Sequence, residues 1–169
     1  RDRCGGDPAA HLGHLARHYP SCWTFAVDGM IGATPELLVR LEGRRLFSRV
    51  LAGTARRHDA AGAAAPVGPG VSPTGEDAAP TTDVLEDLAA WLSRSGKNRE
   101  EHELARASAV HALAPLCSVV EAPEPFVLTL PNLLHLASDV TGVVAGDTGA
   151  LSLVRALHPT AAVCGAPTP

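Results

Sequence analysis

Several features are scarce or missing in this 169-residue sequence, and each absence excludes a class of protein. Positive charge is not in excess: 14 Lys and Arg residues stand against 18 Asp and Glu residues, whereas nucleic-acid-binding domains usually carry a basic face. No apolar run approaches the roughly 20 residues of a transmembrane helix. The first residues lack the apolar stretch of a secretory signal. We therefore expect a cytoplasmic protein that binds neither nucleic acid nor membrane.

Cysteine and lysine are also scarce. The four cysteines are scattered without CxxC spacing, which fits buried thiols in a reducing compartment better than a disulfide scaffold or a zinc site. Lys97 is the only lysine, and every other basic residue is arginine. Hydrophobic residues make up 46% of the chain and the mean hydropathy is +0.09. This length and composition predict one globular domain with its own core.

Strand and helix patterns alternate along the chain. Residues 21–29 alternate in polarity and end in the turn pair Asp28-Gly29, and two apolar runs flank Glu42-Gly43 as in a tight hairpin. These three strands are expected to share an antiparallel sheet. Further strands are predicted at 125–130 and 133–144, and helices at 8–18, 83–92, 149–157 and from about residue 99 to Pro115.

The segment 58–82 differs in composition from the rest. It holds Gly, Pro, Ala, Ser and Thr with almost no large apolar side chains, so we expect a low-complexity, disordered surface loop. The order of the other elements, strands followed by a helix, more strands and another helix, predicts an α+β fold in which helices cover antiparallel sheet layers.

Two short stretches before this loop carry candidate chemistry. Glu36 follows Pro35 at the entrance to a strand, where a stiff backbone would present its carboxylate. Gly53 and Thr54 would let a ligand approach the backbone beside a hydroxyl group. Each signal alone is weak, because an acidic residue at a strand entrance is usually a solvated surface residue.

Further candidates lie in the second half. Glu101 falls in line with Leu104, Ala105 and Ser108 on the predicted helix, so its carboxylate could lie on the inner face and bind Mg²⁺, although a solvated first-turn glutamate is the commoner outcome. His135 lies within an alternating strand, where a histidine is more often part of the core or an edge.

Three histidines near the start, His11, His14 and His18, recur at helical spacing and could converge on a metal ion. Solvated side chains are the expected alternative, because Leu12 and Leu15 would form the buried face of that helix.

Five segments in this order resemble the chorismate-binding enzymes, and the isochorismate synthases among them most. They are GATPELL (32–38), LAGTARR (51–57), KNREEHEL (97–104), LLHLASDVTG (133–142) and LHPTAAVCGAP (157–167). The resemblance implies that residues 1–169 are the central part of a chorismate-binding catalytic domain with an incomplete version of that fold. It also implies Mg²⁺ as the cofactor, chorismate as the substrate, and a monomer when complete.

The resemblance also implies roles for individual residues. Glu36 matches the acid that protonates the departing C4 hydroxyl while water adds at C2, and Glu101 matches a Mg²⁺ ligand. Gly53, Thr54 and His135 match positions that border the substrate. Two more substrate-binding positions are matched in the last segment, Ala162 and Gly165.

Other family members stay open as alternatives. GTARRH and HELARAS replace the GTRPRG and DLARND motifs of anthranilate synthases, and Ala162 stands where members that aminate or eliminate pyruvate tend to have threonine. The family's general base, a lysine, and its second metal-binding glutamate have no counterpart here. Isochorismate synthase activity serving menaquinone or siderophore synthesis is therefore the leading expectation. Salicylate synthase, anthranilate synthase component I and a non-catalytic remnant are the alternatives.

Overall fold

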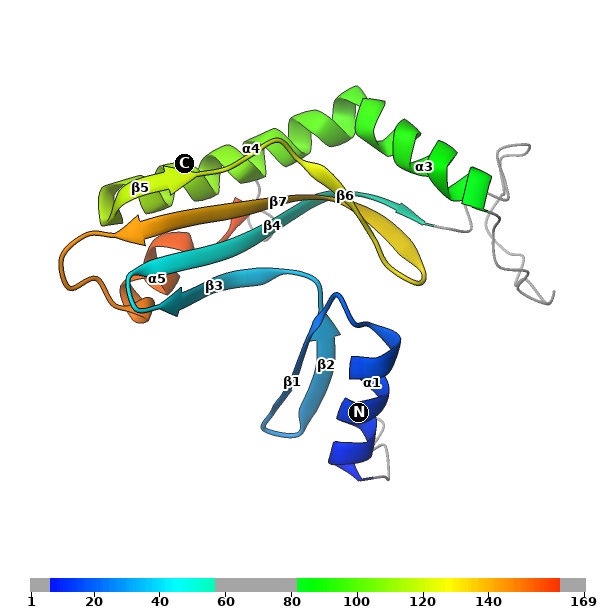
Figure 1. The fold of residues 1–169 in the computed structure, drawn as a ribbon, viewed down its shortest axis with the longest axis horizontal. Coiled ribbons are helices and arrows are strands. Elements are labelled where there is room, and N and C mark those ends of the chain that lie inside the picture. The colour runs from blue at the N-terminus through cyan, green and yellow to red at the C-terminus, as the bar shows by residue number, and fades with distance from the viewer. Residues whose placement is uncertain (1–6, 57–81, 162–169) are drawn as a thin grey trace.

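The computed structural model describes residues 7–56 and 82–161, in which helices cover an antiparallel sheet and a hairpin projects from it (Figure 1). In chain order, the elements are α1 (Pro8–His18), β1 (Trp23–Val27), β2 (Met30–Thr34), β3 (Leu37–Glu42), β4 (Arg45–Arg56), α3 (Thr82–Arg94), α4 (Gly96–Leu113), the 3₁₀ turn η1 (Ala114–Leu116), β5 (Cys117–Glu121), β6 (Phe126–Thr129), β7 (Leu133–Val144) and α5 (Ala150–Leu157). The predicted α+β class is confirmed.

The projecting part consists of α1 and the β1–β2 hairpin (Figure 1). Asp28 and Gly29 form its turn with φ of 48° and 81°, the left-handed region that Asp-Gly turns adopt. Our prediction that residues 21–29 join the sheet of the next two strands is wrong, because β1 pairs with β2 alone in a two-stranded sheet. The strand β2 was missed because its sequence, MIGAT, is short and contains glycine.

The main sheet has β7 at its centre. The predicted hairpin is confirmed, although its two-residue turn is formed by Gly43 and Arg44 and not by Glu42 and Gly43. The strand β3 pairs with β4, and β4 pairs with β7 along most of its length. The other edge of β7 is shared by β5, which pairs near Val143, and β6, which pairs near Leu136. All of these pairings are antiparallel. The strand β5, which follows the predicted end of the helix at Pro115, was not predicted.

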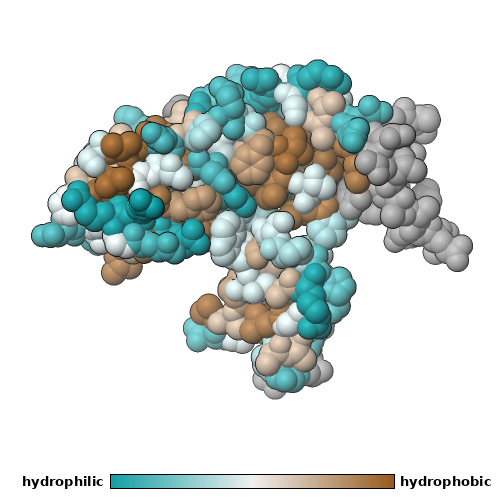
Figure 2. Space-filling view, viewed as in Figure 1, coloured by the Kyte–Doolittle hydropathy of each residue, from teal (hydrophilic) through white to brown (hydrophobic). Residues whose placement is uncertain are grey.

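One face of this sheet carries the helices. The larger core cluster joins α4 and α5 to the sheet through Ala105, Leu113, Val140 and Leu153. A second cluster packs α3 against the other end of the sheet around Leu92 and Leu134. Figure 2 shows apolar side chains gathered over β6 and the neighbouring sheet, and on the β1–β2 hairpin.

The predicted inner face of α4 is right at Ala105 and wrong at Glu101 and Leu104. Leu104 is 48% exposed and Glu101 is also exposed, whereas the buried positions are His102, Ala105, Ala109 and Leu113. The helix also begins three residues earlier than expected, at Gly96, where the Ser95 hydroxyl accepts a hydrogen bond from the Asn98 backbone N–H. A hydrogen-bonded histidine takes the place of an apolar residue on the inner face, so the hydrophobic pattern pointed to the wrong side.

The helices of the described residues include none long and apolar enough to cross a membrane. Most of the predicted loop 58–82 lies outside the described residues, and its last residue, Thr82, begins α3.

Candidate active site

Glu36 lies at the edge of a cavity of about 430 Å³. It occupies the link between β2 and β3, where its backbone N–H donates to the Thr34 hydroxyl at 3.2 Å and Pro35 restrains the turn. The cavity lies between β3, β4, α4 and the segment that follows α5. Its other polar lining residues are Ser48, Arg49, Ser108, His111, His158 and Thr160.

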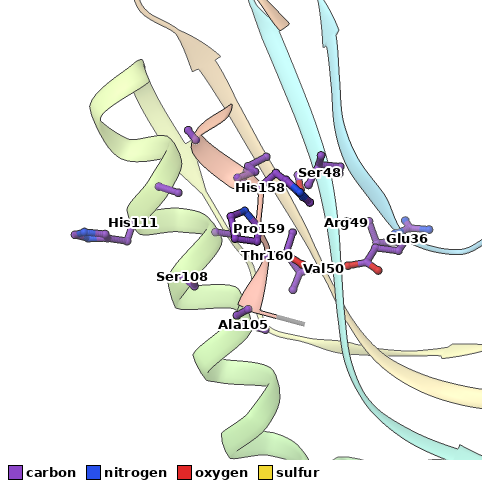
Figure 3. Close-up of a pocket in the computed structure, with 16 residues that line it drawn as sticks. Glu36, Ser48, Arg49, Val50, Ala105, Ser108, His111, His158, Pro159 and Thr160 are labelled. Atoms are coloured by element: carbon purple, nitrogen blue, oxygen red, sulfur yellow. The ribbon is translucent and has the colours of Figure 1, made fainter. Parts of the chain in front are cut away.

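Figure 3 shows the chain at His158, Pro159 and Thr160 lying between α4 on one side and Val50 and Glu36 on the other. These three residues belong to the LHPTAAVCGAP segment that was singled out in the sequence. The structure therefore brings the first and last of the five segments together at one cavity.

Burial raises the pKa of the Glu36 carboxyl group above its usual range. Glu36 has no ion pair within the described part of the chain, so desolvation acts without an opposing cation. A carboxyl group held towards its protonated form can donate a proton to a leaving hydroxyl, which an ordinary surface glutamate at neutral pH cannot do.

Arg49, the one arginine among the residues that line the cavity, is already paired. Its guanidinium group makes a bidentate contact with Asp139, at 2.6 Å from Nε to Oδ1 and 2.8 Å from Nη2 to Oδ2. It also lies over the rings of Trp23, Phe47 and Phe126, at 5.3 to 5.7 Å from their centroids. These contacts hold the cation on the sheet face opposite the helices. An unpaired arginine here would favour the ionised form of Glu36.

Gly53, Thr54 and His135 form a second group, and none of them lines the Glu36 cavity. The Thr54 hydroxyl and His135 Nδ1 are 2.9 Å apart across the β4–β7 pair. Burial lowers the pKa of His135, and a hydrogen bond with the Gly53 backbone opposes this in part. The neutral ring has one nitrogen that donates and one that accepts, so the pair can orient a polar ligand.

Gly53 is required by the local backbone. Its φ of +80° belongs to the left-handed region, and the β4–β7 register shifts between Leu51 and Thr54. A Cβ at Gly53 would lie 3.1 Å from the Asn98 Cβ and 3.3 Å from its carbonyl oxygen. The bulge therefore lies directly against the first turn of α4.

Glu101 lies on the exposed side of α4, where Lys97 Nζ approaches its carboxylate at 3.7 Å. The described residues include no group of three His, Cys, Asp or Glu side chains placed to hold a metal ion. A single exposed carboxylate still fits Mg²⁺, because this ion commonly binds one or two protein carboxylates and keeps several waters.

Two of the predicted substrate-binding residues, Ala162 and Gly165, lie outside the described residues. The His14 and His18 rings stack with their centroids 3.9 Å apart, and α1 has no fully buried side chain.

The sequence reasoning missed several residues that the structure places at or beside the site. Ser48, His158 and Thr160 line the cavity, and His102 is buried next to Glu101 in the same motif. His158 and Thr160 could have been found from the LHPTAAVCGAP segment, in which only Ala162 and Gly165 were singled out. No comparable signal pointed to Ser48 in the interior of a strand.

Comparison with known proteins decides the family. The sequence profile of the chorismate binding enzymes matches residues 1–169. The chain belongs to the chorismate binding enzyme family.

The isochorismate synthases are among its relatives within this family. The isochorismate synthase DhbC of Bacillus subtilis is 34% identical over 93% of this chain and 37% of its own length. A solved structure from Bacillus anthracis, described as a 2,3-dihydroxybenzoate-specific isochorismate synthase, is 32% identical with a TM-score of 0.72, over 96% of this chain and 40% of that one. The menaquinone-specific isochorismate synthase MenF of Escherichia coli is 25% identical with a TM-score of 0.73, over 95% of this chain and 33% of that one. The chain thus spans well under half the length of these relatives.

Proposed function

We propose that this chain supplies part of the active site of an isochorismate synthase, which converts chorismate to isochorismate. The observation that supports this most directly is the half-buried Glu36 carboxyl group, whose pKa is raised by burial beside a cavity of about 430 Å³. The relatives named as isochorismate synthases indicate the reaction class. The Glu36 carboxyl group is a proton donor that suits this reaction.

In the proposed reaction, water adds at C2 of chorismate, the ring double bonds shift, and the C4 hydroxyl leaves. Glu36 donates a proton to the departing hydroxyl, which leaves as water. A base removes a proton from the attacking water, so that one water is consumed and one is released. We assign this base outside the chain, because Lys97 is the only lysine and its exposed ammonium group lies beside Glu101.

The second group of residues would hold the substrate. The Thr54 hydroxyl and the His135 ring offer hydrogen bonds to a polar substituent, and Gly53 precedes Thr54 in the same bulge of β4. Glu36 and the Thr54–His135 pair lie at different parts of the sheet. In this proposal they contact different parts of one chorismate molecule.

Mg²⁺ is proposed as the cofactor, and when bound it would offset the negative charge of the substrate carboxylates. Glu101 would contribute one oxygen ligand. The exposed position of its carboxylate on α4 is compatible with this role, because the ligand must be reached from outside the helix–sheet core.

The test is direct. The protein expressed from its complete open reading frame is incubated with chorismate and Mg²⁺, and the products are separated by chromatography. The proposal expects isochorismate to accumulate from chorismate until the two isomers reach equilibrium. Salicylate and pyruvate as the products, or anthranilate when an ammonia source is added, would contradict it and favour another branch of the family.

A further inference from the structure

The first turns of α4 are fastened to the β4 bulge by a buried histidine. His102 Nδ1 lies 3.2 Å from the Ala52 carbonyl oxygen, and Ala52 is the residue immediately before Gly53. The ladder between β4 and β7 is interrupted there, with a register shift between Leu51 and Thr54. The Ala52 carbonyl at this irregularity therefore finds its partner on the helix.

The other ring nitrogen of His102 is also engaged. Its Nε2 lies 2.8 Å from the Ser138 hydroxyl oxygen on β7. His102 is 1% exposed and Ser138 is fully buried. In the neutral ring, Nδ1–H donates to the Ala52 carbonyl and Nε2 accepts from the Ser138 hydroxyl, so both nitrogens are satisfied. One side chain thus joins α4 to both central strands.

Close packing extends this connection to the residues of the proposed substrate group. The Gly53 backbone lies against Asn98 at the start of α4, as the 3.1 Å approach of a hypothetical Cβ shows. The next residue, Thr54, is 2.9 Å from His135 through its hydroxyl. A shift of the Ala52 carbonyl would therefore move both neighbours that face the substrate in the proposed reaction.

We propose that His102 is a positioning residue, which holds Gly53 and Thr54 at the β4 bulge in their substrate-binding conformation through the Ala52 carbonyl. This inference rests on the proposed function, in which these two residues contact chorismate. His102 itself contacts no substrate, because it is buried between α4 and the sheet. Its hydrogen bond gives a partner to the part-buried Ala52 carbonyl at the bulge, where Ala52 has no residue opposite it on β7.

Two substitutions separate the ring nitrogens. In His102→Asn the amide nitrogen occupies nearly the place of Nδ1, so the bond to Ala52 can persist while the bond to Ser138 is lost. In His102→Gln the longer amide reaches the place of Nε2, so Ser138 keeps a partner and Ala52 loses its donor. His14→Gln, at an exposed position in α1, is the matched control.

Two measurements are made on the protein from the complete open reading frame. We expect His102→Gln to raise the KM for chorismate by about tenfold with a smaller change in kcat, and His102→Asn to stay within about threefold of wild type. Amide hydrogen exchange at Gly53 and Thr54 should speed up about tenfold in His102→Gln, while exchange at the core residue Leu113 is unchanged. The His14→Gln control should match wild type in both.

Several outcomes would overturn the positioning role. Equal effects of the Asn and Gln variants on KM, in step with their loss of thermal stability, would show that His102 only supports the core. Wild-type exchange at Gly53 and Thr54 in His102→Gln would show that the bulge does not depend on this bond. If the wild-type protein makes no isochorismate, the proposed function fails, while the exchange comparison still decides whether His102 holds the bulge.

Discussion

Glu36→Gln tests the proton donor with little change in shape. Gln keeps the length and polarity of the side chain but has no acidic proton to give. The anchoring bond of this residue is made by its backbone, from the Glu36 N–H to the Thr34 hydroxyl at 3.2 Å, so the substitution leaves it in place. The cavity should therefore keep its lining and lose only the chemistry of the carboxyl group.

The expected effect on the rate follows from the role of a general acid. Proton transfer by a positioned side chain contributes about 10²- to 10⁴-fold, which corresponds to about 2.7 to 5.4 kcal/mol of the activation barrier. We expect kcat for chorismate to fall by at least about 10²-fold while KM changes little, because binding of the ground state does not require the proton. Both constants come from initial rates of isochorismate formation at saturating Mg²⁺.

The pH dependence gives an independent check of the same residue. Because burial raises the pKa of Glu36, the acid is in its active form below that raised pKa, and wild-type activity should decline as pH rises through it. The stability contributed by the protonated group is fully present below the ordinary glutamate pKa of about 4.3 and is lost as pH rises through the folded-state pKa. At neutral pH, Glu36→Gln should therefore unfold at the same temperature as wild type or slightly higher.

Near-normal kcat in Glu36→Gln would refute this reasoning, whatever its stability. A large loss of activity accompanied by a clear drop in thermal stability would also count against it, because the carboxylate would then be a structural partner rather than a desolvated acid. Only the acid role predicts three results together in Glu36→Gln. The variant loses activity, keeps its thermal stability, and no longer shows the decline in activity as pH rises.

The remaining predictions concern stability and the proposed metal ligand. Leu113→Ala, in the core between α4 and the sheet, should lower the free energy of unfolding by about 2–5 kcal/mol in urea titrations, whereas Leu151→Ala, at 79% exposure, should change it by less than about 0.5 kcal/mol. Asp139→Asn should cost about 1.5–3 kcal/mol in the same assay, because it weakens the bidentate contact of a mostly buried arginine; unchanged stability would show that the ring contacts suffice. Glu101→Gln should raise the Mg²⁺ concentration for half-maximal activity at least about tenfold while Lys97→Gln does not; equal responses would identify Glu101 as a surface ion-pair partner only.

Local signals in the sequence predicted the parts of the fold that depend on neighbouring residues. The Asp28-Gly29 pair forms a tight turn with both residues at positive φ, as expected. The second predicted hairpin also occurs, but its turn is formed by Gly43 and Arg44, one residue later than the predicted pair. Such local signals do not predict which strands pair when they are distant in sequence. Whether residues 21–29 join the main sheet depends on the competing partner β2, which no local pattern identified.

Only those residues of the candidate site that belong to a sequence motif could be predicted. Glu36 was singled out by its place behind Pro35, and the resemblance gave it a role. The cavity beside it depends on His158 and Thr160, more than a hundred residues later, and on packing of α5 against α4. Periodicity cannot report such a juxtaposition, because it describes one element at a time. The raised pKa likewise arises from burial by the assembled fold and not from the residues next to Glu36.

The side of α4 that faces the sheet gives two neighbouring residues, Glu101 and His102, different surroundings. Successive residues of an α-helix are turned by about 100°, so Glu101 and His102 cannot both point to the sheet. The hydrophobic pattern favoured the face of Leu104, yet the sheet contacts the face of His102, whose polarity is balanced by Ala52 and Ser138. This orientation of α4 leaves the Glu101 carboxylate on the outer side of the helix, where an ion or substrate can reach it. It also places His102 against the bulge that carries Gly53 and Thr54. The KNREEHEL segment therefore presents the proposed Mg²⁺ ligand Glu101 outward and His102 inward, against the residues proposed to bind the substrate, from adjacent positions on one turn of one helix.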